Sequence, residues 1–228
     1  MSTSTPDGRE ADPRSATDTG GRAETGTADP QEALALLRAE RTRTSRALQP
    51  DARLLYGVWG LAWLVGFVAL WTATTGRGPL VLPGAVAETT FGLLLAAALV
   101  VTTVHVARRS AGVRGASARQ GAMYGWAWFL GFGLYFAVMA SAADAGASAG
   151  LLGVLAPALA GLVVGLLYLS GGAMWQDRTM YTLGAWVLVA SAADALAGFP
   201  TNQLVMGLLG GGGFLVAAVV LHLRGRSA

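Results

Sequence analysis

The sequence contains no cysteine and no lysine, and it has few charged residues of any kind. Only 13% of its 228 residues are charged and 54% are hydrophobic, whereas soluble domains carry about 25% charged residues. Without cysteine, the chain can have no disulfide framework, no thiol nucleophile and no thiolate metal site. The composition therefore favours an integral membrane protein over a soluble one.

The sequence signatures of common enzymes are also missing. There is no HExxH zinc motif, no GxSxG nucleophile motif and no GxxxxGK phosphate-binding loop. The stretch at residues 170–172, Ser-Gly-Gly, lacks the preceding glycine that a membrane serine protease requires. We therefore predict that the protein is not an enzyme and that it has no cofactor, no bound metal ion and no nucleic-acid partner.

The charge that is present is concentrated at the N-terminus, where residues 1–53 hold 17 of the 29 charged side chains. Residues 1–29 are rich in Ser, Thr, Gly, Pro and Asp, which cannot bury enough apolar surface to offset the entropy of ordering. We predict a disordered tail here. It does not read as a secretory signal, because no apolar core follows a positively charged start.

A basic juxtamembrane segment is predicted over residues 30–53. Asp29, Pro30 and Glu32 form a helix-start signature, and the helix should stop before Pro50 because proline breaks a helix interior. An arginine near an anionic lipid surface contributes about 1 kcal/mol to binding. The segment would contact either the lipid surface or a cytoplasmic partner through Arg38, Arg41, Arg43 and Arg46.

Six apolar runs follow, each long enough to cross a hydrocarbon core of about 30 Å as an α-helix. They lie at 54–75, 86–107, 122–143, 150–171, 180–199 and 203–223. They must be helices, because lipid cannot pair with exposed backbone groups and the runs lack the alternation of barrel strands. We predict an all-α polytopic membrane protein with a six-helix transmembrane bundle over 54–223 and a short tail over 224–228.

The placement of arginine predicts the orientation of this bundle. Twelve arginines flank the spans on one side, and Arg77 alone lies on the other. Basic flanks stay in the cytoplasm, so both termini should be cytoplasmic and the spans should form three hairpins. Similar stretches at 60–67 (GLAWLVGF) and 125–132 (GWAWFLGF), and ASAADA at 140–145 and 190–195, favour either internal repetition or convergence on good helix packing.

Glycine is abundant, with 32 residues, and its spacing indicates close helix packing. Pairs of glycines four residues apart allow a neighbouring backbone to approach, within the bundle or in a homo-oligomer; they are Gly121 and Gly125, Gly161 and Gly165, and Gly207 and Gly211. Glycine weakens a helix by about 1 kcal/mol relative to alanine. The sixth span is therefore predicted to bend or partly unwind at Gly210, Gly211, Gly212 and Gly213, either to form a transport site or to pack tightly.

Three carboxylates are predicted near the outer face: Glu88, Asp144 and Asp194. Asp194 lies deepest in its span, and a carboxylate at the bilayer centre costs about 2.5–3.5 kcal/mol. The three would form a cation- or proton-binding ring or remain solvated acids at the interface. His105 and His222, at matching inner ends of their spans, are either a pH-sensitive cytoplasmic gate or interfacial histidines in contact with water.

The segments LLYGVWGLAWLVGF, SARQGAMYGWAWFLGF and LVVGLLYLSGGAMWQDR resemble a group of six-span integral membrane proteins of actinobacteria, usually described as transporters or as hypothetical membrane proteins. The resemblance covers about residues 31–223. It implies a multi-pass protein of the bacterial inner membrane and transport activity, and it supplies no site residues.

Two functional hypotheses follow from the residues. The first is a small-molecule or ion transporter, or a permease-like subunit, driven by an ion gradient or by a separate cytoplasmic ATPase. The alternative is a non-transporting membrane scaffold or sensor that presents its basic N-terminal helix to a cytoplasmic regulatory partner. The sequence specifies no substrate.

Overall fold

The computed structural model describes residues 31, 34–35, 51–78, 80–111 and 115–225. The chain divides into two units, Met1–Thr44 and Ser45–Ala228, and the second contains all the spans. The predicted tail over 1–29 and the arginines of the basic segment (Arg38, Arg41, Arg43 and Arg46) lie outside the described residues.

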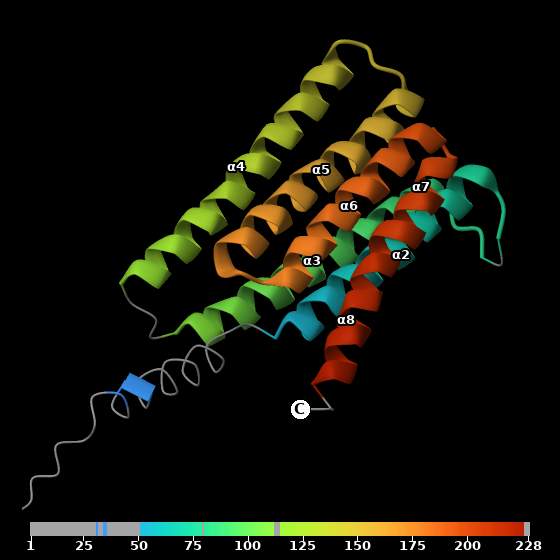
Figure 1. Ribbon diagram of the computed structural model, residues 1–228. Coiled ribbons are helices and arrows are strands. Elements are labelled where there is room, and N and C mark those ends of the chain that lie inside the picture. The colour runs from blue at the N-terminus through green and yellow to red at the C-terminus, as the bar shows by residue number, and fades with distance from the viewer. Residues whose placement is uncertain (1–30, 32–33, 36–50, 79, 112–114, 226–228) are drawn as a thin grey trace, which may run out of the picture. The chain divides into compact units, whose positions relative to one another are not determined.

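Every regular element in the described part of the chain is a helix, and six helices are long and apolar enough to cross a membrane (Figure 1). The first five are α2 (Ala52–Thr75), α3 (Gly84–Ser110), α4 (Ala116–Asp144), α5 (Ala149–Trp175) and α6 (Arg178–Ala197). The sixth span consists of α7 (Thr201–Val205), the π-helical segment η1 (Met206–Gly211) and α8 (Gly212–Arg224). The prediction of an all-α bundle with six membrane-spanning helices is thus confirmed.

Short polar signals in the sequence set several helix ends. Asp51 caps α2 by accepting a hydrogen bond from the Arg53 amide at 3.0 Å. Asp177 caps α6 by accepting from the Thr179 amide at 2.8 Å. Gly76 ends α2 in the left-handed conformation (φ 67°), which glycine adopts without the steric cost of a side chain.

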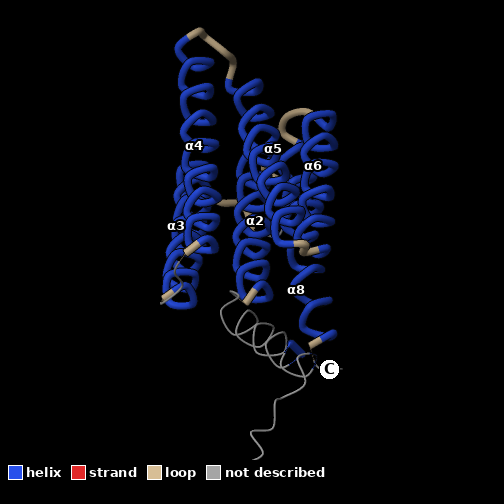
Figure 2. The backbone as a smooth tube through the Cα atoms, turned by 60° about the vertical axis from the view of Figure 1, so that its left-hand side comes forward, coloured by secondary structure: helices blue, strands red, loops and turns tan. Residues whose placement is uncertain are grey.

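Most of the described arginines lie at one end of the bundle. Consecutive spans run in opposite directions (Figures 1 and 2), so the starts of α2, α4 and α6 share an end with the finishes of α3, α5 and α8. This arginine-rich end carries Arg53, Arg108, Arg109, Arg119, Arg178 and Arg224, and Arg77 lies at the opposite end. The pattern matches the one from which the orientation was predicted; the cytoplasmic location of this end stays a prediction.

Two of the three glycine pairs allow close packing within the bundle. In α5, a Cβ on Gly165 would lie 3.1 Å from the carbonyl oxygen of Gly184 in α6. In the sixth span, a Cβ on Gly211 would lie 2.6 Å from the backbone nitrogen of Leu64 in α2. Gly121 and Gly125 on α4 have no such neighbour within 4 Å, so packing within the bundle does not explain that pair, and the homo-oligomer interpretation stays a prediction.

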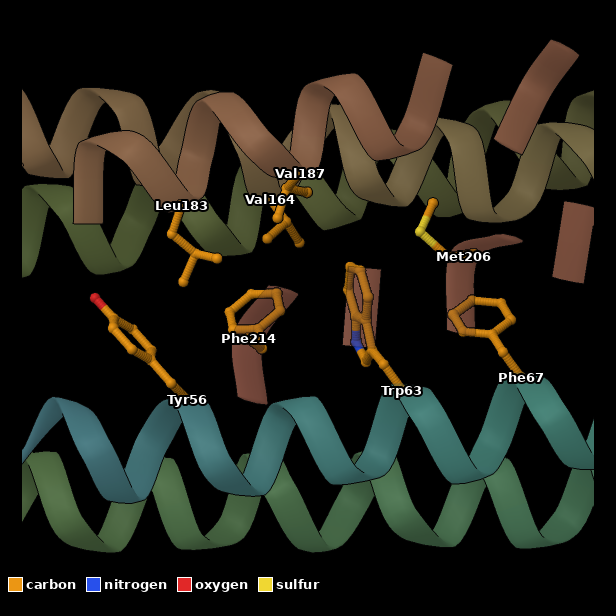
Figure 3. Packing of buried hydrophobic residues seen from close by; sticks show 8 residues of the cluster. All are labelled: Tyr56, Trp63, Phe67, Val164, Leu183, Val187, Met206 and Phe214. Carbon is orange, nitrogen blue, oxygen red and sulfur yellow. The ribbon is translucent and has the colours of Figure 1, made fainter. Parts of the chain in front are cut away.

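An apolar core, largely aromatic on the α2 side, lies between α2, α5, α6 and the sixth span. Figure 3 shows Tyr56, Trp63 and Phe67 of α2 beside Phe214 of α8, with Met206 of η1 nearby. The ring centroids of Trp63 and Phe214 are 5.5 Å apart, in an edge-to-face arrangement. Such contacts contribute about 0.5–1.5 kcal/mol beyond apolar burial. These side chains fill the middle of the bundle.

The sixth span departs from the predicted break at Gly210–Gly213. The chain remains helical throughout, and it widens into a π-helix over Met206–Gly211, while Gly212 and Gly213 are already α-helical. The side chain of Trp186 in α6 stabilises this segment by donating a hydrogen bond from Nε1 to the carbonyl oxygen of Leu209 at 2.8 Å. With this hydrogen bond in place, the glycine-rich segment forms a π-helix and does not unwind.

We expect Gly211→Ala to destabilise the bundle by about 1–3 kcal/mol, the usual cost of overpacking. The new Cβ would meet the Leu64 nitrogen at 2.6 Å and the Gly60 carbonyl oxygen at 3.0 Å, and neither backbone atom can rotate away. Gly212→Ala is the matched control, because no atom of a neighbouring helix lies within 4 Å of that position. Thermal unfolding in detergent micelles measures both variants, and equal melting temperatures would contradict the tight α2 contact.

Candidate functional site

Buried polar side chains gather at the end of the bundle opposite the arginine-rich end. In the described part of the chain, all the buried polar or charged side chains lie here: Thr72 of α2, Ser191 and Asp194 of α6, and Asn202 and Gln203 of α7. We call this group, together with Thr74 of α2, the Asp194 cluster. Its members come from the last turns of two spans and the first turn of a third, where the chain reverses direction.

Hydrogen bonds connect three members of this cluster, Asn202, Thr74 and Gln203, to neighbouring helices. The Asn202 amide donates from Nδ2 to the carbonyl oxygen of Gly153 in α5 at 2.9 Å. The Thr74 hydroxyl donates to Gln203 Oε1 at 3.3 Å and to the Leu70 carbonyl oxygen at 2.7 Å. These bonds hold α7 against α5 and α2, so the start of the sixth span is fixed from two sides.

Asp194 is the exception in this cluster. Its side chain is fully buried, and neither Oδ1 nor Oδ2 has a hydrogen-bond partner among the described residues. The Asn202 side chain lies beside the carboxyl group and interacts with it, but not in hydrogen-bond geometry, and Asn202 Oδ1 is also unpartnered. An ionised carboxylate buried without a partner costs several kcal/mol, so the site favours uptake of a proton or a cation.

The position of Asp194 along its helix adds to this effect. It lies in the last turn of α6, which ends at Ala197, and the C-terminal end of a helix carries partial negative charge. A second negative charge at that end is unfavourable. The helix and the apolar surroundings therefore both disfavour the ionised carboxylate.

Glu88 and Asp144 do not join Asp194 in a common site. Both acids are exposed, Glu88 on α3, which packs mainly against α2, and Asp144 on α4, which packs mainly against α5. Among the described residues, no group of three His, Cys, Asp or Glu side chains could hold a metal ion. The predicted ring of three carboxylates is thus reduced to Asp194, because the rotations of α3 and α4 leave Glu88 and Asp144 exposed on the surface of the bundle.

The two histidines occupy different environments at the arginine-rich end. His105 of α3 accepts a hydrogen bond through Nε2 from the Asp51 amide at 2.9 Å, and it thereby ties the start of α2 to the end of α3. His222 is exposed in the last turn of α8. His105 thus has a structural partner that the sequence did not predict, and the gate hypothesis stays a prediction.

The backbone amide of Asp51 donates to His105, and the side-chain carboxylate of the same residue is stabilised in its ionised form. Partial burial raises the pKa of its carboxyl group, but the hydrogen bonds from the Arg53 side chain and amide, with the positive charge of Arg53, outweigh burial and leave the pKa below its usual value. The ion pair between Arg53 Nε and Asp51 Oδ1 measures 3.1 Å. Asp51 therefore stays ionised and paired at neutral pH.

Two grooves on the bundle surface lie away from Asp194. One, of about 480 Å³, is lined by Ala137, Val138, Ser141, Ala142 and Ala145 of α4 and the residue that follows it. The other, of about 300 Å³, lies between α2 and α3 at the arginine-rich end. Neither groove reaches the Asp194 cluster.

Comparison of the chain with protein families, with curated proteins and with solved structures finds no match. The fold and composition are those of a multi-pass integral membrane protein. Within it, the candidate site rests on geometry alone.

Sequence reasoning identified Asp194 but missed the residues around it. By sequence, Asn202 falls between the apolar runs 180–199 and 203–223, and Gln203 is the first residue of the second run. The available signal was the pair of adjacent amides within a segment that is otherwise apolar, because such side chains need internal partners in lipid.

We expect Asp194→Asn to stabilise the protein at neutral pH by about 1 kcal/mol or more, because a neutral amide removes the cost of burying an unpartnered carboxylate or of protonating it on folding. Asp144→Asn on α4 is the control, since that carboxylate is exposed and its replacement should leave stability unchanged. Thermal unfolding of the purified variants measures the effect. A loss of stability in Asp194→Asn alone would show that the carboxylate has a structural role.

Proposed function

We propose that the protein is a small transporter of the bacterial cell membrane in which Asp194 takes up and releases the coupling proton. The observation that supports this most strongly is a fully buried carboxylate, in a membrane-spanning helix, whose two oxygens have no hydrogen-bond partner. Ionisable residues at membrane depth commonly mark ion pathways and proton relays.

A proton fits this site better than a metal cation does. A cation needs a shell of several oxygen ligands, as oxygen-bound metal sites illustrate, and the described residues offer here three unpartnered buried side-chain oxygens, Oδ1 and Oδ2 of Asp194 and Oδ1 of Asn202. A proton needs only the carboxylate itself. Protonation neutralises the group, which makes its burial inexpensive, and deprotonation favours exposure to water.

The irregular sixth span supports a moving element at this site. The π-helical η1 segment follows directly after α7, which carries Asn202 and Gln203, and π-helical turns occur frequently at functional sites. Transporters often build their sites on helices that are interrupted at membrane depth. A shift of α7 relative to α6 would alter the access of water to Asp194.

In this proposal the described conformation is closed toward the arginine-rich end, which we place in the cytoplasm. The core residues Tyr56, Trp63 and Phe214 fill the bundle on that side of Asp194. Alternating access would require these rings to separate as the two sides of the bundle rock against each other. The transported small molecule or ion is not identified by these residues.

The filled core also favours the second candidate, a membrane scaffold or sensor. A polar substrate requires a polar path, and the core cluster is made of apolar and aromatic side chains. A scaffold would act through the basic segment at 30–53, and a cytoplasmic ATPase or regulatory protein would be its partner. Deleting residues 30–49 should then release a protein that co-purifies with the full chain, and an unchanged set of co-purified proteins would count against the scaffold.

The transporter proposal predicts that Asp194→Asn abolishes uptake driven by a pH gradient. Purified protein in proteoliposomes would be tested with radiolabelled amino acids, sugars and inorganic ions, with and without an imposed pH difference. Asp144→Asn is the matched control and should retain full uptake. Uptake by Asp194→Asn equal to wild type would remove this residue from the mechanism.

A second readout follows the proton directly. A hydrophobic carbodiimide reacts with protonated carboxyl groups in apolar surroundings, so peptide mass spectrometry should find Asp194 modified more as the pH is lowered. Exposed Asp144, in the same molecules, serves as the internal comparison. Equal modification of Asp144 and Asp194 at every pH would argue against a special proton site.

A further inference from the structure

The groove between α2 and α3 is lined by aliphatic side chains and by two nitrogen-bearing side chains. It is not part of the proposed transport site. Its lining consists of one residue of α2 and five of α3: Leu54, Val100, Val101, Val104, His105 and Arg108. The groove lies on the outer surface of two membrane-spanning helices at the arginine-rich end. In a bilayer, this surface faces lipid.

The polarity changes along the length of α3. Val100, Val101 and Val104 come first on α3, and Leu54 of α2 belongs to the same lining; Leu54 is 43%, Val100 60% and Val104 43% accessible. His105 and Arg108 follow within about one helical turn, toward the end of the bundle. An apolar trough that ends in nitrogen donors near the membrane surface matches one phospholipid, with its acyl chain along the valines and its headgroup at the rim.

The donors at this rim are suited to an anionic phosphate group. His105 accepts the Asp51 amide at Nε2, so the ring is neutral at that nitrogen and carries its proton on Nδ1 as a donor. Arg108 adds a positive charge, and the arginine guanidinium can bind phosphate through two parallel hydrogen bonds. The neighbouring carboxylate, Asp51, is already paired with Arg53 at 3.1 Å.

The second hairpin lacks these donors at the corresponding positions. Trp59 donates to Thr102 at 2.9 Å and Tyr124 donates to Leu167 at 3.0 Å, so α4 and α5 repeat the α2–α3 pairing with a shift of 65 residues (59 to 124, 102 to 167). The same shift places Ser170 where α3 has His105, and Ala173 where α3 has Arg108. The charged end of the groove is therefore particular to the first hairpin and is not a general feature of the packing.

We propose that the α2–α3 groove is a binding site for one anionic phospholipid, whose phosphate is bound by Arg108 and His105. Basic pockets between spanning helices at a membrane face bind such headgroups in other proteins. Binding there would stabilise the junction at which His105 ties α2 to α3. The site is separate from Asp194, so it stands or falls independently of transport.

The test uses the full-length protein in a neutral detergent, with phosphatidylglycerol and phosphatidylcholine of identical acyl chains added in series. Native mass spectrometry counts bound lipids, and thermal unfolding gives the apparent affinity. We expect one tightly bound phosphatidylglycerol per chain, a raised melting temperature, and at least tenfold weaker binding in Arg108→Gln, since a hydrogen bond to a charged group is lost. Inorganic phosphate alone should have no effect, because it cannot fill the apolar part of the groove.

Two further variants separate a specific site from general surface charge. Arg119→Gln removes an equal charge at the same end of the bundle, from the exposed start of α4, and should bind phosphatidylglycerol as wild type does. Val101→Trp obstructs the trough without changing charge and should weaken binding. Equal losses in Arg108→Gln and Arg119→Gln, no preference for phosphatidylglycerol, or unchanged binding in Val101→Trp would each overturn the proposal.

Discussion

Lipid offers no hydrogen bonds, so polar groups within the spans must find their partners inside the protein. The chain meets this requirement by forming helices and by directing individual side chains at carbonyl or hydroxyl oxygens of neighbouring helices. Trp59 reaches Thr102, Tyr124 reaches the Leu167 carbonyl, and Trp186 reaches the Leu209 carbonyl in η1. Against this background the two unpartnered oxygens of Asp194 are a departure that packing alone does not explain.

The same hydrogen bonds explain why two stretches of the sequence resemble each other. Trp59 and Tyr124 occupy corresponding positions, and their acceptors lie at corresponding positions on the following helix. In the shared GxAWxxGF pattern, Trp63 belongs to the core and Trp128 packs against it. The first two hairpins thus use one packing scheme twice, which is expected both of internal repetition and of convergence on good helix packing.

The third hairpin does not follow that scheme. Its Trp186 bonds to a π-helical segment, for which the first two hairpins offer no counterpart, and α6 packs most closely against α5, in the preceding hairpin. The shared ASAADA stretch leaves Asp144 exposed and buries Asp194. Similar letters therefore have different environments, because the helix that follows α6 folds back over it, whereas the end of α4 stays open.

The number, order and approximate limits of the spans could be predicted from the sequence, because length and hydropathy determine what fits a bilayer. The partners of individual residues could not, since they depend on how each helix is rotated and tilted. The spacing of Gly121 and Gly125 is the same as that of Gly161 and Gly165, yet only the second pair contacts a neighbouring helix. The start of α4 at Ala116 instead of residue 122 has a similar origin, because its polar first turns lie beyond the apolar run.

Close backbone contacts divide α2, α5, α6 and the sixth span into two tightly packed pairs. Glycine contacts bind α5 to α6 and α2 to the sixth span through backbone atoms, so these pairs resist separation. Side-chain hydrogen bonds join the two pairs from Asn202 to the Gly153 carbonyl at 2.9 Å and from Trp186 to the Leu209 carbonyl at 2.8 Å, whereas the bond between Thr74 and Gln203 lies within the second pair. Asp194 lies in α6 beside Asn202 of α7, so a change in its charge would act directly where the two pairs meet.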